Sequence, residues 1–449
     1  MIKKNLINKI NYLIEEKKYP EIKNLLPPHP EDIARIISAL PTASCKLIVF
    51  RLVHYSRAVD VFEYLSTEEE EEMLKSLNSQ EIKGILNEMS PDDRTELFEE
   101  VPAELVKKFM SLLSPEERKV AVQILNYPDD SIGRLITPDF VQLYEGMTAQ
   151  QAIDHIRSVG LGKETIYHCY VLDNEKKLIG IVSLKKIVLA DQQTKVSEIM
   201  FREVISVTAF ADQEEATNIF KRYDLIVLPV VDNNNKLLGI VTFDDLVDVL
   251  EDETTEDFEK IAAVLPVEKP YLEANVFSLV WKRSFWLIVL VIFESISAFV
   301  LQRHHATIRQ FIALTFFIPV LVAMGGNTGT QSATIIIRSL ATGDIGVKDF
   351  FKVIFRESFV GVLIGLILAV VGAIIVAVLQ KDLLLSLAVS ISMGVTILLA
   401  TTLGGSLPIL FRKLKLDPAL MSGPLIATIV DVVGILIYFE IAKLILGLN

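Results

Sequence analysis

The chain has 449 residues, 51% of them hydrophobic and 22% charged, and its 57 acidic and 44 basic residues give a net charge of -13. This length exceeds one ordinary domain, and the acidic balance argues against nucleic acid as a partner and favours cations. The two cysteines, Cys45 and Cys169, have no paired spacing, which excludes a disulfide framework and a thiolate metal site.

Charged and apolar residues are separated along the chain. Charged residues dominate up to about residue 275, whereas long runs of Leu, Ile, Val and Ala dominate from Ser284 onward. This change predicts a soluble part followed by a membrane part. The segment after Met1 is amphipathic and lacks the apolar core of a signal peptide, so we expect the soluble part to stay in the cytoplasm. No nucleophile–base set or cofactor motif is present, so we do not predict an enzyme.

Residues 1–130 predict an acidic domain of short helices. Prolines followed by acids, as at Pro91 and Pro115, recur every one to two dozen residues and are typical of helix starts. We expect a stack of helical hairpins that forms a small all-α superhelix. Asp60, Asp92 and Glu96 gain interest only if another acidic surface faces them.

Residues 131–250 contain one pattern twice, and we place the two copies at 131–195 and 196–252. Each copy has a helix, an apolar strand, an Asp/Asn turn and a second strand through Gly180 or Gly239. The two copies should pack as one α/β unit. This resembles a tandem cystathionine-β-synthase (CBS) pair.

The resemblance to a CBS pair implies a nucleotide site. CBS pairs often hold the ribose of an adenine nucleotide with a Ser/Thr-x-x-Asp motif. The motif is complete at Thr242–Asp245 and lacks its acid at Ser183–Lys186. ATP is therefore an expected partner of the second repeat.

A connecting helix, placed at 253–280, follows the second repeat. Acids at 245, 248, 252, 256 and 259 recur at steps of three and four and share one stripe. Solvation alone could explain an acidic face. Because the helix leads into the first membrane span, the alternative is a sensor of divalent cations that moves a pore.

The membrane part, 281–449, predicts five helical spans, at about 284–302, 311–337, 357–379, 383–411 and 418–446. Basic residues lie between the second and third spans and between the fourth and fifth, which places both loops in the cytoplasm. We therefore expect a multi-pass plasma (inner) membrane protein with a cytoplasmic N-terminus and an external C-terminus.

The fifth span carries an acid, Asp431, near the bilayer midplane. An intramembrane carboxylate is costly unless it meets water, a cation or a partner. Pro424 predicts a kink that frees the carbonyl of Leu420, and the carbonyl of Ala427 lies one turn before Asp431. Oxygen ligands on one stripe suit a hard cation such as Mg²⁺. The alternative is an acid buried against a polar partner, and Glu294 in the first span is either a packing or a lumen contact.

The second span carries a polar wall. Gly325, Gly326 and Gly329 expose backbone, and Asn327, Gln331 and Thr334 recur at helical spacing. We predict that Gly325, Gly326, Asn327 and Gln331 line a path for a hydrated cation. A glycine-packed helix crossing explains the glycines but not the amides.

Taken together, these features resemble the MgtE family of magnesium transporters and channels along the whole chain. The resemblance implies a homodimer in which the second and fifth spans line a shared pore. It implies that Asp431 and the Ala427 carbonyl hold hydrated Mg²⁺, and that cytosolic Mg²⁺ closes the gate. Some members carry Asn where this chain has Gly423, so a side-chain ligand is absent there.

The resemblance also assigns regulatory Mg²⁺ ligands by position. On the cytosolic domains these are Asp60, Asp92, Glu96, Glu214, Asp224, Asp245 and Asp248. At the connecting helix and the fifth-span entrance they are Glu253, Glu256, Asp257 and Asp417. The competing hypotheses are a proton-coupled or broader divalent-cation carrier, for example of Co²⁺ or Mn²⁺, and a membrane-anchored sensor without transport.

Overall fold

The computed structural model describes residues 4–267, 271–272, 274–420 and 423–448. The chain divides into two compact units, Met1–Leu250 and Glu251–Asn449. Each unit is described by itself.

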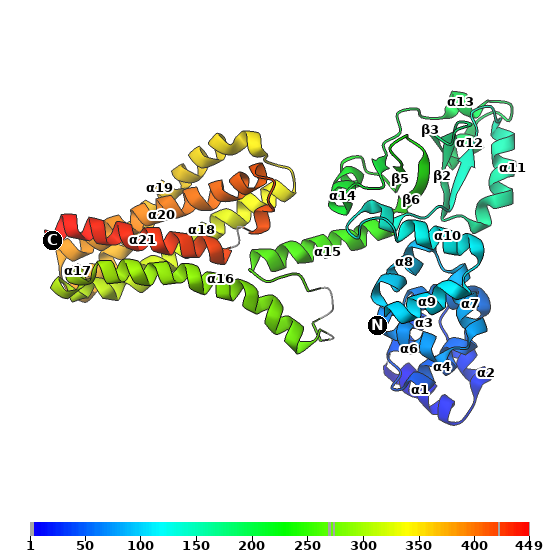
Figure 1. Ribbon diagram of the computed structural model, residues 1–449, viewed down its shortest axis with the longest axis horizontal. Helices are drawn as coiled ribbons and strands as arrows, with labels where there is room; N and C mark the ends of the chain where they lie inside the picture. The colour runs from blue at the N-terminus through cyan, green and yellow to red at the C-terminus, as the bar shows by residue number, and fades with distance from the viewer. Residues whose placement is uncertain (1–3, 268–270, 273, 421–422, 449) are drawn as a thin grey trace. The chain divides into compact units, whose positions relative to one another are not determined.

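The first unit begins with ten short helices (Figure 1). They are α1 (Lys4–Glu15), α2 (Tyr19–Leu25), α3 (Pro30–Ser38), α4 (Ala43–Leu52), α5 (Tyr55–Glu63), α6 (Thr67–Ser76), α7 (Ser79–Glu88), α8 (Pro91–Glu100), α9 (Ala103–Leu112) and α10 (Pro115–Ile124). The predicted starts at Pro91 and Pro115 are confirmed, because Ser90 and Ser114 cap these two helices by accepting from backbone N–H groups. The all-α character of this region is thus as predicted.

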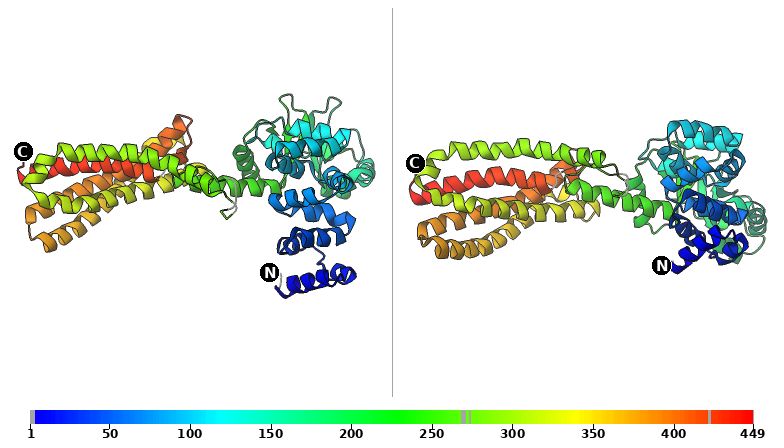
Figure 2. Two further views of the ribbon diagram at one scale, coloured as in Figure 1. Left: turned by 60° about the horizontal axis from the view of Figure 1, so that its bottom comes forward. Right: turned by 90° about the horizontal axis from the view of Figure 1, so that it is seen from below.

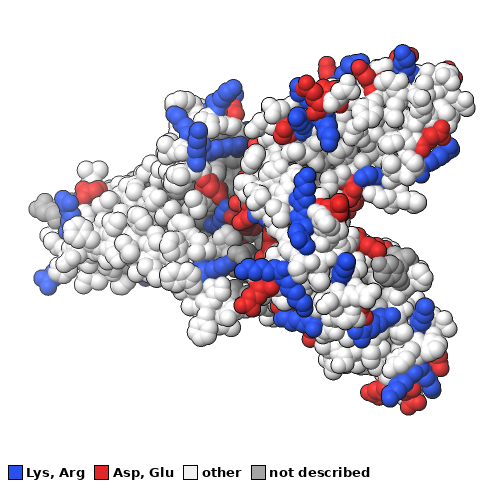
Figure 3. Space-filling view, turned by 45° about the vertical axis from the view of Figure 1, so that its right-hand side comes forward, with Lys and Arg blue, Asp and Glu red and all other residues white. Residues whose placement is uncertain are grey.

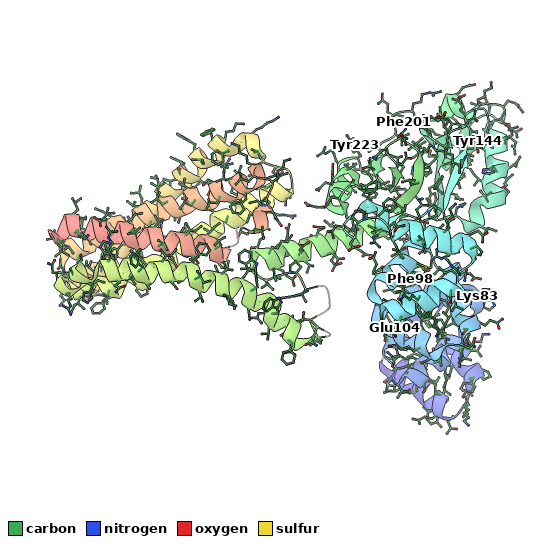
Figure 4. The ribbon with its side chains drawn as sticks, in the orientation of Figure 1. Lys83, Phe98, Glu104, Tyr144, Phe201 and Tyr223 are labelled. Carbon is green, nitrogen blue, oxygen red and sulfur yellow. The ribbon has the colours of Figure 1, made fainter. Side chains whose placement is uncertain are left out.

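One apolar core runs through the stack of helices. Phe98 of α8, labelled in Figure 4, stacks on Phe109 of α9 with ring centroids 6.4 Å apart. Arg94 is fully buried, donates to the carbonyl of Leu86 and pairs with Glu117 at 2.5 Å. A buried guanidinium requires such partners, so Arg94 fixes the start of α8 against α7 and α10.

Two three-stranded sheets follow, and they confirm the internal repeat. The first contains β1 (Phe140–Leu143), β2 (Thr165–Leu172) and β3 (Leu178–Ser183), and the second contains β4 (Val207–Thr208), β5 (Val227–Val231) and β6 (Leu237–Thr242). In each sheet the first pair of strands is parallel and the second antiparallel. The short helices of this region are η1 (Ile132–Leu135), α11 (Ala149–Val159), η2 (Gly160–Gly162), α12 (Leu184–Leu189), α13 (Val196–Ile199) and α14 (Gln213–Arg222).

The two repeats share a core, as the sequence predicted. Buried Tyr170 and Leu178 of the first repeat pack with Val231 and Ile240 of the second. The backbone N–H of Leu178 also donates to the carbonyl of Asn235 at 2.9 Å. These residues of the two sheets therefore pack against one another and are shielded from solvent.

Helix α15 (Phe243–Ile261) passes from the first unit into the second. The sequence placed a connecting helix at 253–280, but the helix ends at Ile261. Ala263 adopts a positive φ of 55°, and Pro266 follows, so the backbone leaves the helical conformation there. The next helix begins only at Val276.

In the second unit, five of the described helices are long and apolar enough to span a membrane. They are α16 (Val276–Arg303), α18 (Ile318–Ala341), α19 (Phe350–Gln380), α20 (Leu383–Lys413) and α21 (Gly423–Leu446), and they run alongside one another (Figure 2). The short elements between them are α17 (His305–Gln310), η3 (Ile312–Phe317), η4 (Val347–Asp349) and η5 (Pro418–Leu420). The predicted five spans are confirmed, although the first helix starts eight residues earlier than the span at 284.

Charged residues lie mainly at the ends of these helices, and apolar residues cover their middle, as is typical of helices that span a membrane. On the face shown in Figure 3, Lys, Arg, Asp and Glu gather at the ends of the helices and are sparse along their length. Exposed apolar residues such as Leu366, Ile367 and Val370 of α19 cover the middle. Such an apolar surface is stable only against lipid.

The prolines of the second and fifth spans lie in the first turns of the described helices. Pro424 lies in the first turn of α21, which starts at Gly423, and Pro319 lies in the first turn of α18. A proline in the first turn of a helix has no intrahelical N–H bond to lose. The predicted kink at Pro424 also involves the residues directly before it and stays a prediction. Met421 and Ser422, between η5 and α21, lie outside the described residues.

Candidate cation pathway and acidic sensor surfaces

Gly326 of α18 and Ala427 of α21 lie in direct contact. A Cβ placed on Gly326 would stand 3.1 Å from the Cβ of Ala427 and 3.8 Å from Oδ1 of Asp431. A larger side chain would separate the two helices, so glycine brings the backbone of α18 up to the acid. This is the close approach that the sequence predicted for the glycines.

Asp431 has a buried oxygen without a partner. Within the described residues, its Oδ1 is buried and has no hydrogen bond. Glu294 of α16 interacts with it electrostatically, and this interaction is repulsive when both groups are charged. Since an unpaired buried carboxylate is costly, the site favours a cation or ordered water beside this oxygen. The alternative of a polar protein partner at Oδ1 finds no support among the described residues.

Asn327 and Gln331 are exposed on α18, whereas Gly325 and Gly326 are buried. Gly325 faces Val430 of α21 and Thr396 of α20, so it packs helices together. The exposed amides form a polar stripe on a helix that is otherwise suited to lipid. Such a stripe is stable against water or another polar surface, not against hydrocarbon.

A second set of predicted residues meets at the end of α15. Lys260 pairs with Glu256 at 2.5 Å and with Asp417 at 2.8 Å. Burial raises the pKa of Asp257, and the charges of Asp417 and Glu256 add to this effect, while Lys260 and Arg338 oppose it. Glu256, Asp257 and Asp417 are therefore brought together as the resemblance implied. Glu253 lies one turn before Asp257 on the same helix.

Sequence reasoning missed Lys260. Its ammonium group pairs with Glu256 and Asp417, and its charge also acts on Asp257. Burial alone would lower the pKa of its ammonium group, but the hydrogen bonds to Asp417 and Glu256 outweigh burial and raise the pKa. The signal was present, because Lys260 follows Glu256 by four residues. The acidic stripe of this helix was recognised in the sequence, whereas the lysine that lies beside it was not.

A third set forms between α8 and the second repeat, inside the first unit. Burial, reinforced by the charges of Asp245 and Asp93, raises the pKa of Asp92 to about 7. Burial also raises the pKa of Asp245 to about 7, although hydrogen bonds from Thr242 oppose this. Asp248 acts electrostatically on Asp93. The acids of two different domains thus face one another.

Asp93, Glu63 and Asp244 also belong to this cluster and were not predicted. Burial raises the pKa of Glu63 to about 7, with further contributions from Asp93, Asp60 and Asp92. The pair Asp92–Asp93 at the start of α8 was visible in the sequence, but its partners depend on the tertiary fold. We call the residues Asp60, Glu63, Asp92, Asp93, Asp244, Asp245 and Asp248 the interdomain acidic cluster.

The remaining predicted ligands lie on the surface. Glu96 of α8 and Glu214 of α14 are exposed, and Asp224, also exposed, follows α14 with a positive φ of 48°. Across the described residues, no three His, Cys, Asp or Glu side chains form a group arranged to hold a metal ion. The acids are gathered, but a regulatory ion would require them to move closer.

The nucleotide motif of the second repeat is folded as a helix cap. The Thr242 hydroxyl donates to Asp245 at 2.7 Å and also contacts Asp244, while its N–H donates to Asp245 at 3.1 Å. In the first repeat, the Ser183 hydroxyl accepts from the N–H of Lys186 at 3.4 Å. Only the second repeat therefore presents carboxylates at this position.

Comparison with known families matches almost the whole chain. The divalent cation transporter model of MgtE matches residues 318–441, the MgtE intracellular N domain matches 28–130, and CBS domains match 132–192 and 196–252. The chain is 38% identical over 425 residues to the magnesium transporter MgtE of Thermus thermophilus, covering 93% of both chains. The chain belongs to the MgtE family.

Other MgtE proteins support the same assignment. The magnesium transporter MgtE of Bacillus subtilis is 34% identical over 445 residues, with 97% of this chain and 96% of the relative covered. A crystal structure of the cytosolic domain of the Mg²⁺ channel MgtE in complex with ATP aligns with a TM-score of 0.51 and 34% identity. That alignment covers 54% of this chain and 99% of the other. MgtE is a family of transporters, so the prediction of a multi-pass membrane protein that is not an enzyme is confirmed.

Proposed function

We propose that this chain is a Mg²⁺-selective channel or transporter that cytosolic Mg²⁺ closes. The observation that carries the transport part is the buried, unpartnered Oδ1 of Asp431, among the described residues, beside the bare backbone of Gly326. Mg²⁺ dehydrates reluctantly, so one carboxylate, carbonyls such as that of Ala427 and bound water suit it. The similarity to magnesium transporters over nearly the full length supports the choice of ion.

The pathway forms in a homodimer. The exposed Asn327 and Gln331 are the support for this, because a second copy would enclose the polar stripe and keep it away from lipid. With the N-terminus in the cytoplasm, the stripe and Asp431 lie between the two sides of the membrane. Cross-linking through Cys introduced at Asn327 would give dimers, and exclusively monomeric protein would contradict this arrangement.

Regulation acts through two acidic surfaces. The interdomain acidic cluster repels itself when ionised and is bridged by Mg²⁺, which stabilises the compact arrangement through its higher affinity for that state. At the end of α15, Glu256 and Asp417 pair with Lys260, and together with Asp257 they form the cytosolic gate. Glu96, Glu214, Asp224 and Glu253 belong to the same regulatory set as peripheral ligands.

ATP binds the CBS pair through Thr242 and Asp245. The complete motif in the second repeat and the ATP complex of a related cytosolic domain support this. Titration calorimetry with ATP should show binding to the wild-type chain and at least about tenfold weaker binding to Thr242→Val, because a hydroxyl hydrogen-bonding partner is lost. Equal affinity would refute the assignment.

Reconstituted liposomes test the function itself. We expect Mg²⁺ uptake that exceeds Ca²⁺, Mn²⁺ and Co²⁺ uptake, that does not depend on a pH gradient, and that falls as Mg²⁺ on the cytosolic side rises. Uptake driven by a proton gradient, or equal uptake of Co²⁺ and Mn²⁺, would support the carrier alternative instead. The absence of any cation flux would support a sensor without transport.

A further inference from the structure

Glu294 is an acid in the middle of the first membrane-spanning helix, and the sequence left open whether it is a packing or a lumen contact. It lies about 15 Å along the axis of α16 from Ser284, where the predicted span begins. The side chain of Glu294 is exposed, and it forms no hydrogen bond or ion pair with the described residues. Because an acid at this depth is costly against hydrocarbon, it requires water or a polar partner.

Glu294 lies at the border between two faces of α16. Ser297, about 60° away around the helix axis, is only 4% exposed, and its hydroxyl has no partner among the described residues. Ile292 and Ile296 lie about 200° from Glu294 and are exposed. The side of α16 opposite Glu294 is therefore apolar and suited to lipid, whereas Glu294 borders the side that packs into the bundle.

Three neighbouring helices carry polar residues at the level of Asp431. Helix α21 contacts both α16 and α18. Asp431 of α21 lies close enough to Glu294 of α16 for an electrostatic interaction, and its Oδ1 lies 3.8 Å from a Cβ placed on Gly326 of α18. Exposed Asn327 follows Gly326 directly. These residues therefore form a polar band that runs from α18 across α21 to α16.

Two ordinary roles of a membrane acid do not fit Glu294. A packing contact would be buried inside the bundle, but this side chain is exposed. An acid near a helix end could reach the headgroups, but Glu294 lies near the middle of the span. A water-filled passage beside Asp431 fits both the exposure and the depth of Glu294.

We propose that Glu294 lines the cation pathway, so that the first span contributes to its wall together with the second and fifth spans. The carboxyl oxygens of Glu294 contact the water shell of the passing Mg²⁺, which keeps several of its waters. Glu294 is thus a positioning residue that acts on the ion through water. Its role in ion passage rests on the proposed function, whereas its exposure to water does not.

Cysteine labelling tests where residue 294 lies. The full-length protein carrying Cys45→Ser and Cys169→Ser is placed in lipid nanodiscs without Mg²⁺ and treated with a charged methanethiosulfonate reagent that does not enter hydrocarbon. A thiol reacts as the thiolate, which forms in water, so Glu294→Cys should react at least about tenfold faster than Ile292→Cys. Ile292 is the matched control, because it is exposed on the opposite side of α16 at nearly the same depth. Equal rates for the two variants would overturn the proposal.

Mg²⁺ flux into liposomes tests what the side chain does. Glu294→Leu places an apolar side chain in the wall and should lower Mg²⁺ uptake at least about fivefold, because an apolar constriction expels water. Glu294→Gln keeps a polar side chain and should retain more uptake than Glu294→Leu, and Ile292→Leu is the control that should match the wild type. Wild-type flux through Glu294→Leu would contradict the role in ion passage. If the wild-type protein carries no Mg²⁺, the proposed function fails, while the labelling rates still decide whether residue 294 faces water.

Discussion

Lys260 and Asp417 form an ion pair of 2.8 Å that joins the last turn of α15 to the residue before η5. The same ammonium group contacts Glu256 at 2.5 Å. A resident cation therefore already occupies the centre of the acidic set that we assign to the gate. Regulatory Mg²⁺ must bind beside Lys260 or displace it.

Removal of this ammonium group should make the gate more sensitive to Mg²⁺. In Lys260→Met, Glu256, Asp257 and Asp417 lose their shared positive partner, so Mg²⁺ should close the channel at a concentration lower by about three- to tenfold. The measurement is Mg²⁺ flux as a function of Mg²⁺ on the cytosolic side. Lys443→Met, which removes the partner of Glu440, is the control. An unchanged midpoint, or a higher one, would contradict the role of Lys260.

The interdomain acidic cluster predicts a dependence on pH. The pKa values of Asp92 and Asp245 are raised from 3.8 to about 7, so the folded cluster binds protons more tightly than the unfolded chain does. The stabilising effect is complete below about pH 4 and is lost as the pH rises through about 7. The quantity to measure is the rate of amide hydrogen exchange in α8 divided by the intrinsic rate at the same pH. Without Mg²⁺, this ratio should rise at least about tenfold from about pH 5.5 to about pH 8.

Mg²⁺ and substitutions provide the controls for this prediction. Added Mg²⁺ should restore the protection of α8 at the upper end of this pH range, and Asp92→Asn should reduce the dependence on pH. Asp154→Asn, a change of an exposed acid on α11, should leave the dependence as in the wild type. A protection of α8 that rises with pH would show that the cluster is not proton-stabilised.

Close helix packing in the membrane part depends on Gly404. A Cβ at this position would stand 2.3 Å from the carbonyl oxygen of Gly329 and 3.0 Å from the Cβ of Ser332. Gly404→Ala should thus destabilise the membrane helices by about 1–3 kcal/mol, seen as a lower melting temperature of the purified protein. Gly346→Ala is the matched control, because nothing among the described residues lies within 4 Å of its added Cβ. Equal melting temperatures for the two variants would refute this packing.

Local sequence patterns were enough to predict the elements of the fold. Apolar runs long enough to cross a bilayer predicted the five spans, and the repeated strand–turn–strand pattern predicted the CBS pair. Both signals depend on residues close together in the chain. The helix end at Ile261 was predicted incorrectly, because the positive φ of Ala263 leaves no periodic signal in the sequence.

The contacts within the sites could be predicted only in part. Asp431 was identified because a lone acid in an apolar span is unusual, but its approach to Gly326 depends on how α18 packs on α21. Glu63 comes close to Asp92 and Asp93 through the tertiary packing of the N-terminal helices, which the sequence pattern does not reveal.

The central claim, that Asp431 forms the Mg²⁺ site of the pathway, is tested most directly by Mg²⁺ flux into liposomes through Asp431→Asn. Asp382→Asn, which changes the cap of α20, is the control. The proposed site predicts that Asp431→Asn lowers the flux by at least about tenfold, because the full negative charge that α21 carries beside Gly326 is lost, while Asp382→Asn stays close to the wild type. Wild-type flux through Asp431→Asn would contradict the assignment.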